Sequence, residues 1–320
     1  MKSSFVALVA VALAAAPVMS ADLHHYQKTQ GVSGNLNFTG SDTCLNLMTL
    51  WGEAFQQQYP NVRVQGEGKG SSTAPPALIE GTAQIGPMSR AMKSSEVDAF
   101  EERFGYKPTQ YRIALDALAV YVNKDNPIAE KGLTLPQVDA IFSQTRKGGE
   151  TADITTWGQL GLTGEWAGKP ISLYGRNSAS GTYGFFKEEA LFKGDYKDTV
   201  KEQPGSASVV QGVENDRFAI GYSGMGYATS GVQKVPIAEN AGDSMHAAEV
   251  DQVLNGGYPL GRFLYIYVNQ APNSDLDPLV KEFLTFVFSA EGQEQVEKAG
   301  FIPVPASVAE EEIAKTSKHS

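Results

Sequence analysis

Apolar residues recur at helical spacing in several stretches of the chain. The first stripe repeats at steps of four, three and four residues, which is typical of the buried face of a helix. Its members are Cys44, Met48, Trp51 and Phe55. Pro60 follows and ends this predicted helix. Residues 277–288 and 290–298 also have helical composition, and the tail from residue 306 is expected to be a helical or frayed end.

Other stretches have the patterns of strands. Residues 61–65 alternate between apolar and polar, whereas residues 114–123 are almost continuously apolar, as expected of a strand covered on both faces. The tail of that run, residues 118–123, is echoed by residues 264–269. We interpret the two as strands that cross between domains. A chance similarity of two apolar strands is the competing interpretation.

Strands and helices alternate along the whole chain, which predicts an α/β fold with mostly parallel sheets flanked by helices. A chain of 320 residues exceeds one ordinary core, so two domains are expected. Domain II would comprise residues 113–264. Domain I would be discontinuous, comprising residues 22–112 and 265–320.

Residues 1–21 have the pattern of a secretory signal peptide. Lys2 gives a positive start, residues 5–15 are apolar, and residues 16–21 form a small-residue cleavage region. The apolar run is too short to span a bilayer, which takes roughly 20 residues. Cys44 is the single cysteine, so we expect neither a disulfide framework nor a lipid anchor. A free periplasmic protein is predicted.

The net charge of -10 argues against nucleic acid as a partner. A small anion is also repelled by an acidic surface, but at physiological salt this field decays over about 8 Å. A recessed site with its own donors can therefore still bind an anion. The four histidines are scattered without metal-ligand spacing, so neither a metal nor a cofactor is predicted.

An arginine and several small hydroxyl residues stand directly before a helix predicted over residues 182–192. Ser180, Gly181 and Thr182 fall at the start of this helix, where free backbone N–H groups collect. Arg176 adds a planar guanidinium that suits a tetrahedral oxyanion. The pattern predicts an anion site. The alternative is a serine-capped helix beside a solvated arginine.

Three further loops bring hydroxyl or arginine side chains to the ends of predicted strands. They hold Ser41, Asp42 and Thr43, then Ser71 and Ser72, and then Ser89 and Arg90. A plain helix cap explains one such residue better than three in a row. The second loop is not a nucleotide P-loop, because Lys69 is followed by Gly70 rather than by Ser or Thr. In α/β sheets, ligands lie beyond the carboxyl ends of strands, where all these loops are expected.

With these loops in this order, the chain resembles the periplasmic phosphate-binding proteins of the PstS type, the solute receptors of phosphate ABC transporters. The residues that carry the resemblance are 40–43, 68–72, 85–90, 176–182, 219–223 and 300–305. The resemblance implies a type II-like two-domain clamshell with two crossover strands. It also implies a monomer that holds inorganic phosphate in the interdomain cleft and delivers it to an inner-membrane ABC transporter permease.

The resemblance also implies a set of phosphate-binding residues. By position they are Ser41, Asp42, Thr43, Ser71, Ser72, Ser89, Arg90, Arg176, Ser180, Gly181 and Thr182. Many family members have an aspartate where this chain has Arg90, and that aspartate accepts the proton of hydrogen phosphate. We hypothesise that Asp42 replaces it, because a helix N-terminus favours an ionised carboxylate. The alternative is that Asp42 only caps its own helix.

Two other functions are alternatives to transport. A secreted phosphatase needs a nucleophile with a base, or metals. Residues 221–225 fail the G-x-S-x-G pattern at the last position, so no enzyme is predicted. A phosphate-sensing or scavenging protein without a transporter is the remaining alternative, and the sequence does not separate it from the transport role.

Overall fold

The computed structural model describes residues 23–317, and the predicted signal peptide lies outside them. The strands are β1 (Gly34–Gly40), β2 (Val62–Gly68), β3 (Ile85–Met88), β4 (Thr109–Asn123), β5 (Leu133–Thr134), β6 (Ser172–Arg176), β7 (Lys201–Gln203), β8 (Ala219–Gly224), β9 (Val232–Lys234), β10 (Ile237–Ala238) and β11 (Gly261–Val268). The helices are α1 (Asp42–Gln58), α2 (Ala74–Glu80), α3 (Ser94–Phe104), α4 (Ile128–Lys131), α5 (Leu135–Phe142), α6 (Gly181–Glu189), α7 (Ser206–Asn215), α8 (Val250–Leu254), α9 (Pro278–Val287), α10 (Ala290–Lys298) and α11 (Ala306–Ala314). Within this described range, every helix is too short or too polar to cross a membrane.

The main sheet has the strand order β2-β1-β3-β11-β4-β8-β6-β7, with β9 also paired to β4. Of the nine pairings between described strands, five are parallel. The four antiparallel pairings all involve β4 or β11. The predicted α/β class is confirmed, and its sheets are mixed because the crossover strands run against their neighbours.

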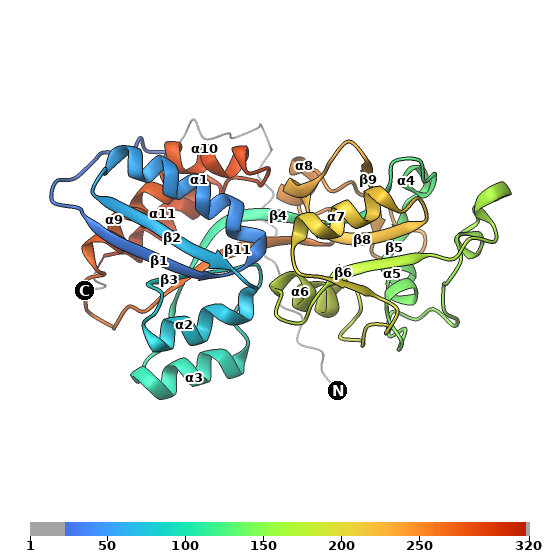
Figure 1. Cartoon of the computed structure of the whole chain (residues 1–320), viewed down its shortest axis with the longest axis horizontal. Helices are drawn as coiled ribbons and strands as arrows, with labels where there is room; N and C mark the ends of the chain where they lie inside the picture. Colours follow the sequence, from blue (N-terminus) through green and yellow to red (C-terminus); the bar gives the residue numbers. More distant parts are fainter. Residues whose placement is uncertain (1–22, 318–320) are drawn as a thin grey trace.

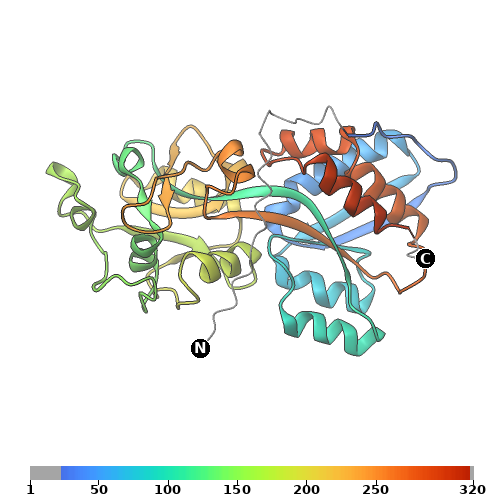
Figure 2. The same ribbon diagram turned by 180° about the vertical axis from the view of Figure 1, so that it is seen from behind.

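The strands β4 and β11 pass side by side through the middle of the molecule and join its two halves (Figures 1 and 2). The two echoed segments do not face each other. Residues 264–268 pair with residues 109–114, whereas residues 118–122 pair with β8. The two predicted crossover strands are confirmed, but the repeat marks different parts of them.

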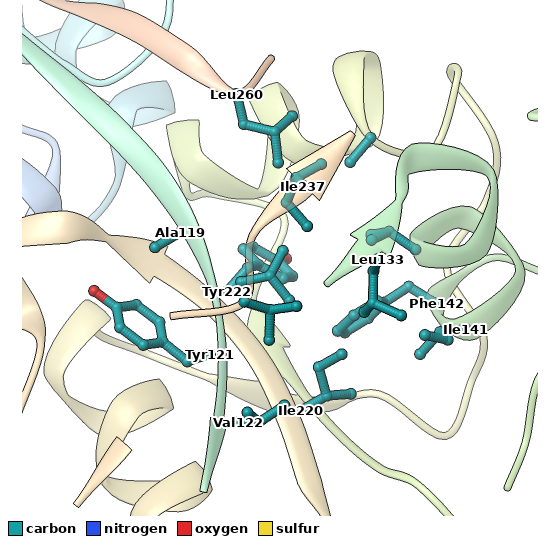
Figure 3. Packing of buried hydrophobic residues seen from close by; sticks show 14 of the residues in the cluster. Ala119, Tyr121, Val122, Leu133, Ile141, Phe142, Ile220, Tyr222, Ile237 and Leu260 are labelled. Atoms are coloured by element: carbon teal, nitrogen blue, oxygen red, sulfur yellow. The ribbon is translucent and has the colours of Figure 1, made fainter. Parts of the chain in front are cut away.

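Each half of the molecule has its own apolar core. One core includes Trp51 and Phe55 of the predicted helical stripe, together with α9 and α10. The other, seen in Figure 3, packs β4 and β8 against α5, with Phe142 and Tyr222 among its aromatic residues. Trp157 is fully buried in this second core.

Two features of the fold differ from the sequence pattern. The helix predicted over residues 182–192 ends at Glu189, because Phe192 and Lys193 adopt positive φ angles of 50° and 61°. Such angles lie in the left-handed region, which a right-handed helix cannot include. The helix α3 was not predicted. Phe100 is its single buried residue, so its apolar stripe is short.

The aromatic contacts of the second core predict a large cost for truncating Phe142. This ring is fully buried, and it packs edge-on against Phe186 and Tyr222 at centroid distances of 5.2 and 5.8 Å. We expect Phe142→Ala to lower the free energy of unfolding by about 3–5 kcal/mol in urea titrations. Leu254→Ala is the control and should change it by less than about 0.5 kcal/mol, since Leu254 is 47% exposed. Equal losses in the two variants would contradict the assignment of this core.

Candidate anion-binding site

The predicted hydroxyl loops meet at the junction of the two halves. Ser41 is the N-cap of α1 and Ser180 is the N-cap of α6. The Ser180 hydroxyl accepts a hydrogen bond from Tyr183 N at 3.3 Å. Ser72 contacts the loop before α6, because its N–H and its hydroxyl both donate to Ala179 O. The loops before α2 and α6 thus contact each other across the junction.

One group of three buried hydroxyls comes entirely from the first half. Ser41 Oγ donates to Ser89 Oγ at 3.0 Å, and Ser71 Oγ lies 3.3 Å from the same oxygen. Ser89 N also donates to Ser71 Oγ at 3.0 Å. A Cβ atom at Gly181 would stand 2.1 Å from Ser71 Oγ and 2.6 Å from Ser89 Oγ. Only glycine lets the start of α6 approach these hydroxyls so closely.

A second group of buried hydroxyls joins the two halves. Thr43 Oγ1 of α1 lies 2.9 Å from Thr182 Oγ1 of α6 and 3.4 Å from Ser206 Oγ of α7. Ser206 was not among the predicted site residues. It follows Pro204 and Gly205 at the start of a helix, so the pattern that marked the other hydroxyl loops is present there too.

Arg176 lies beside the second group and is 1% exposed. Its Nη1 donates to Ser206 Oγ at 2.7 Å and lies 3.2 Å from Asp42 Oδ2, and its Nη2 donates to Pro204 O. Burial lowers the pKa of the guanidinium, and the Asp42 carboxylate opposes this shift. Arginine remains protonated all the same. Its buried Nε has no hydrogen-bond partner among residues 23–317.

Asp42 lies in the first turn of α1 and reaches the second half of the molecule. Its Oδ2 accepts a hydrogen bond of 2.7 Å from Ser206 N, so the carboxylate caps α7 rather than its own helix. The same oxygen contacts Arg176. Neither sequence hypothesis for Asp42 included this bridge between α1, α7 and the buried arginine.

Arg90 is turned toward α3 rather than toward the hydroxyl groups. Its two terminal nitrogens donate to Glu96 at 2.7 and 2.6 Å. The pair lies at the rim, with the side chains 10% and 16% exposed. A Cβ atom at Gly184 would come within 3.2 Å of Arg90 Cδ, so this side chain also packs on α6.

A second arginine contacts the hydroxyl groups, and the sequence reasoning missed it. Arg262 of β11 donates to Asp116 Oδ2, to Ser89 O and to Thr182 Oγ1. Asp116 did carry a signal, because it is the one charged residue in the apolar run 114–123 and a buried carboxylate requires a partner. No pattern in the residues around Arg262 marked it as part of the site.

The fold agrees with comparisons with known proteins. A PBP superfamily domain matches residues 27–291. The phosphate-binding protein PstS of Pseudomonas aeruginosa is 57% identical, over 97% of this chain and 95% of its own length. The phosphate-binding protein PstS of Staphylococcus haemolyticus is 28% identical, over 90% of this chain and 87% of its own length. A Clostridium perfringens protein solved with bound phosphate is 28% identical, with a TM-score of 0.72. The match covers 85% of this chain and 100% of that protein.

The first of these findings defines the class of protein, which is that of the PBP superfamily. Within it, the chain belongs to the PstS family. The resemblance drawn from the sequence is thereby confirmed. Membership of a family of binding proteins also confirms the prediction that the chain is not an enzyme.

The rim pair predicts a specific pH dependence of stability. Burial raises the pKa of Glu96, but hydrogen bonds from Arg90 and from Lys93 N–H outweigh it and leave this pKa below its ordinary value. A carboxyl whose pKa is lower in the folded state contributes stability above its unfolded pKa, about 4.3, and loses it as the pH falls through the folded value.

We therefore expect Glu96→Gln to cost about 1 kcal/mol at pH 7. In denaturant titrations the difference from the unmodified chain should shrink as the pH falls below about 4.3 and disappear once the pH is below the folded pKa of Glu96. Glu53→Gln, an exposed change in α1, is the control and should leave the pH profile unaltered. A constant difference from pH 3 to 8 would show that the ion pair does not act through charge.

Proposed function

We propose that the chain binds one inorganic phosphate at the junction of its two halves and delivers it to an ABC transporter permease. The observation that carries this proposal is Arg176, a buried guanidinium that donates to the buried Ser206 hydroxyl and whose Nε lacks a partner in residues 23–317. A buried N–H without an acceptor is costly, and an oxyanion supplies one. The PstS relatives are named for phosphate binding.

The hydroxyls suit phosphate because each can turn its proton toward an oxyanion. Four of the six hydroxyls in the two groups stand at the starts of α1, α6 and α7, where backbone N–H groups and the helix dipole favour negative charge. We propose as ligands or near neighbours the residues expected from the sequence, with Ser206 added. Ser72 and Arg90 then belong to the rim, because both side chains are held by other partners.

We further propose that the two halves are domains of a clamshell. Domain I would comprise residues 22–112 and 265–320, and domain II residues 113–264. This division is supported by the two apolar cores, since their members along β4 change over between Ala114 and Ala117. Among the described residues, Ile302 is the one buried member of the second core that comes from residues 265–320. Bonds across the junction, such as Thr43 to Thr182, would then form on closure.

The proposed setting is the periplasm. The sequence pattern of residues 1–21 supports export, and the absence of a disulfide framework is compatible with it. The proposed partners are inorganic phosphate and an inner-membrane permease, with the chain acting as a monomer and without nucleic acid. The acidic net charge of -10 supports the last point.

Isothermal titration calorimetry tests this function. We expect the chain from residue 22 onward to bind phosphate one to one. Arg176→Ala should weaken binding more than tenfold, because hydrogen bonds to charged groups contribute about 1.5–3 kcal/mol each. Ser180→Ala, which removes one cap hydroxyl, should cost less than Arg176→Ala. Circular dichroism spectra of both variants serve as the folding control.

Two results would overturn the proposal. One is binding of an amino acid or a sugar without any heat from phosphate. The other is a loss below tenfold in a folded Arg176→Ala variant, which would remove Arg176 from the site.

The bridge made by Asp42 predicts a change in anion selectivity. Phosphate carries a proton near neutral pH, which it can donate to a carboxylate, whereas sulfate carries none. An ionised carboxylate beside the site therefore disfavours sulfate more than it disfavours phosphate. In Asp42→Asn, the amide oxygen can still accept from Ser206 N, but the negative charge is gone. We expect the preference for phosphate over sulfate to fall about tenfold or more, equivalent to 1.4 kcal/mol.

Competition calorimetry with the two anions measures this ratio. Glu96→Gln, at the rim, is the matched control and should retain the selectivity of the unmodified chain. If Asp42→Asn also retains it, the carboxylate serves only to anchor α7, and the discrimination arises elsewhere.

A further inference from the structure

Arg262 and Asp116 form a buried ion pair between the two crossover strands. They are directly opposite each other in the β4 and β11 pairing, at 6% and 0% exposure. Arg262 Nε and Nη2 both donate to Asp116 Oδ2, at 3.0 and 2.7 Å, and Asp116 Oδ1 accepts from Met225 N. Both charges are thus compensated at the place where the two halves join.

The same guanidinium touches both sides of the proposed phosphate site. Its Nη1 donates to Ser89 O in the first half, and its Nη2 donates to Thr182 Oγ1 in the second, each at 3.0 Å. Four of the five N–H donors of an arginine are used by these bonds. Arg262 is therefore placed to act on the site through its neighbours rather than as a main ligand.

The bond to Thr182 determines which way that hydroxyl can donate. Because Thr182 Oγ1 accepts from Arg262, its own proton is directed to another acceptor, and Thr43 Oγ1 lies 2.9 Å away. Arg176 has the same effect at the other end, since Ser206 Oγ accepts from it and lies 3.4 Å from Thr43 Oγ1. Thr43 thus stands between two hydroxyls, each of which accepts from an arginine.

We infer that Arg262, held by Asp116, is a positioning residue for the proposed phosphate site. It directs the Thr182 proton to Thr43 Oγ1, so that Thr43 in turn presents its own proton rather than a lone pair to the anion. The inference rests on the proposed function. A plain structural alternative exists, in which the ion pair only joins β4 to β11.

A double-mutant cycle separates these two roles. Arg262→Lys keeps the positive charge, but one ammonium group cannot reproduce the planar fork that reaches Asp116, Ser89 and Thr182 together. Thr182→Val removes the hydroxyl that Arg262 orients. We expect Arg262→Lys to weaken phosphate binding about fivefold or more in the unmodified chain, but less than about twofold in the Thr182→Val background.

Equal losses in the two backgrounds would overturn the inference and leave the ion pair structural. Arg112→Lys is the matched control, since Arg112 lies on the other crossover strand, β4, and pairs with Glu311 and Glu312 instead. Its phosphate affinity should be unchanged.

If Arg262→Lys does not fold, the neutral pair Arg262→Gln with Asp116→Asn takes its place in the same cycle. Binding of phosphate by the unmodified chain, together with an additive cycle, would overturn this inference alone. No binding by the unmodified chain would overturn the proposed function as well.

Discussion

Two buried arginines stand at the junction of the two halves, and each has a carboxylate partner that the fold supplies from a distant segment. Arg176 at the end of β6 meets Asp42 of α1, and Arg262 of β11 meets Asp116 of β4. A buried charge without a partner is strongly destabilising. The crossing of β4 and β11 and the approach of α1 to α7 are therefore linked to the neutralisation of these charges. The hydroxyls at the starts of α1, α6 and α7 are arranged around this charge framework.

Close backbone approach is the second constraint on this region. Gly181 lies against Ser71 and Ser89, and Gly70, at a φ of 121°, lies against Ala179. A side chain at either position would force the two halves apart, because the nearest atoms would stand 2.1 and 2.4 Å from its Cβ. These glycines therefore allow hydroxyls from separate loops to come together at one site.

Arg90 shows how a departure from a family pattern can be absorbed locally. Its guanidinium pairs with Glu96 at the start of α3, so the arginine adds no uncompensated positive charge to the hydroxyl groups. Its aliphatic part packs against Gly184 of α6. The residue therefore belongs to the contact between the two halves. The carboxylate nearest to Arg176 comes instead from Asp42.

Local patterns in the sequence determined most of the elements of this protein and the positions of its hydroxyl loops. The stripe from Cys44 to Phe55 marked α1, because a helix buries residues at a fixed short spacing. The small residues before α6 marked its N-terminus for the same local reason. Tertiary structure alone decided the partners. Asp42 caps α7, Arg262 reaches Thr182 and Arg90 turns to Glu96, and the first two contacts span 164 and 80 residues. Such long-range contacts depend on strand order and on the charges that burial forces together, and no spacing within one segment encodes them.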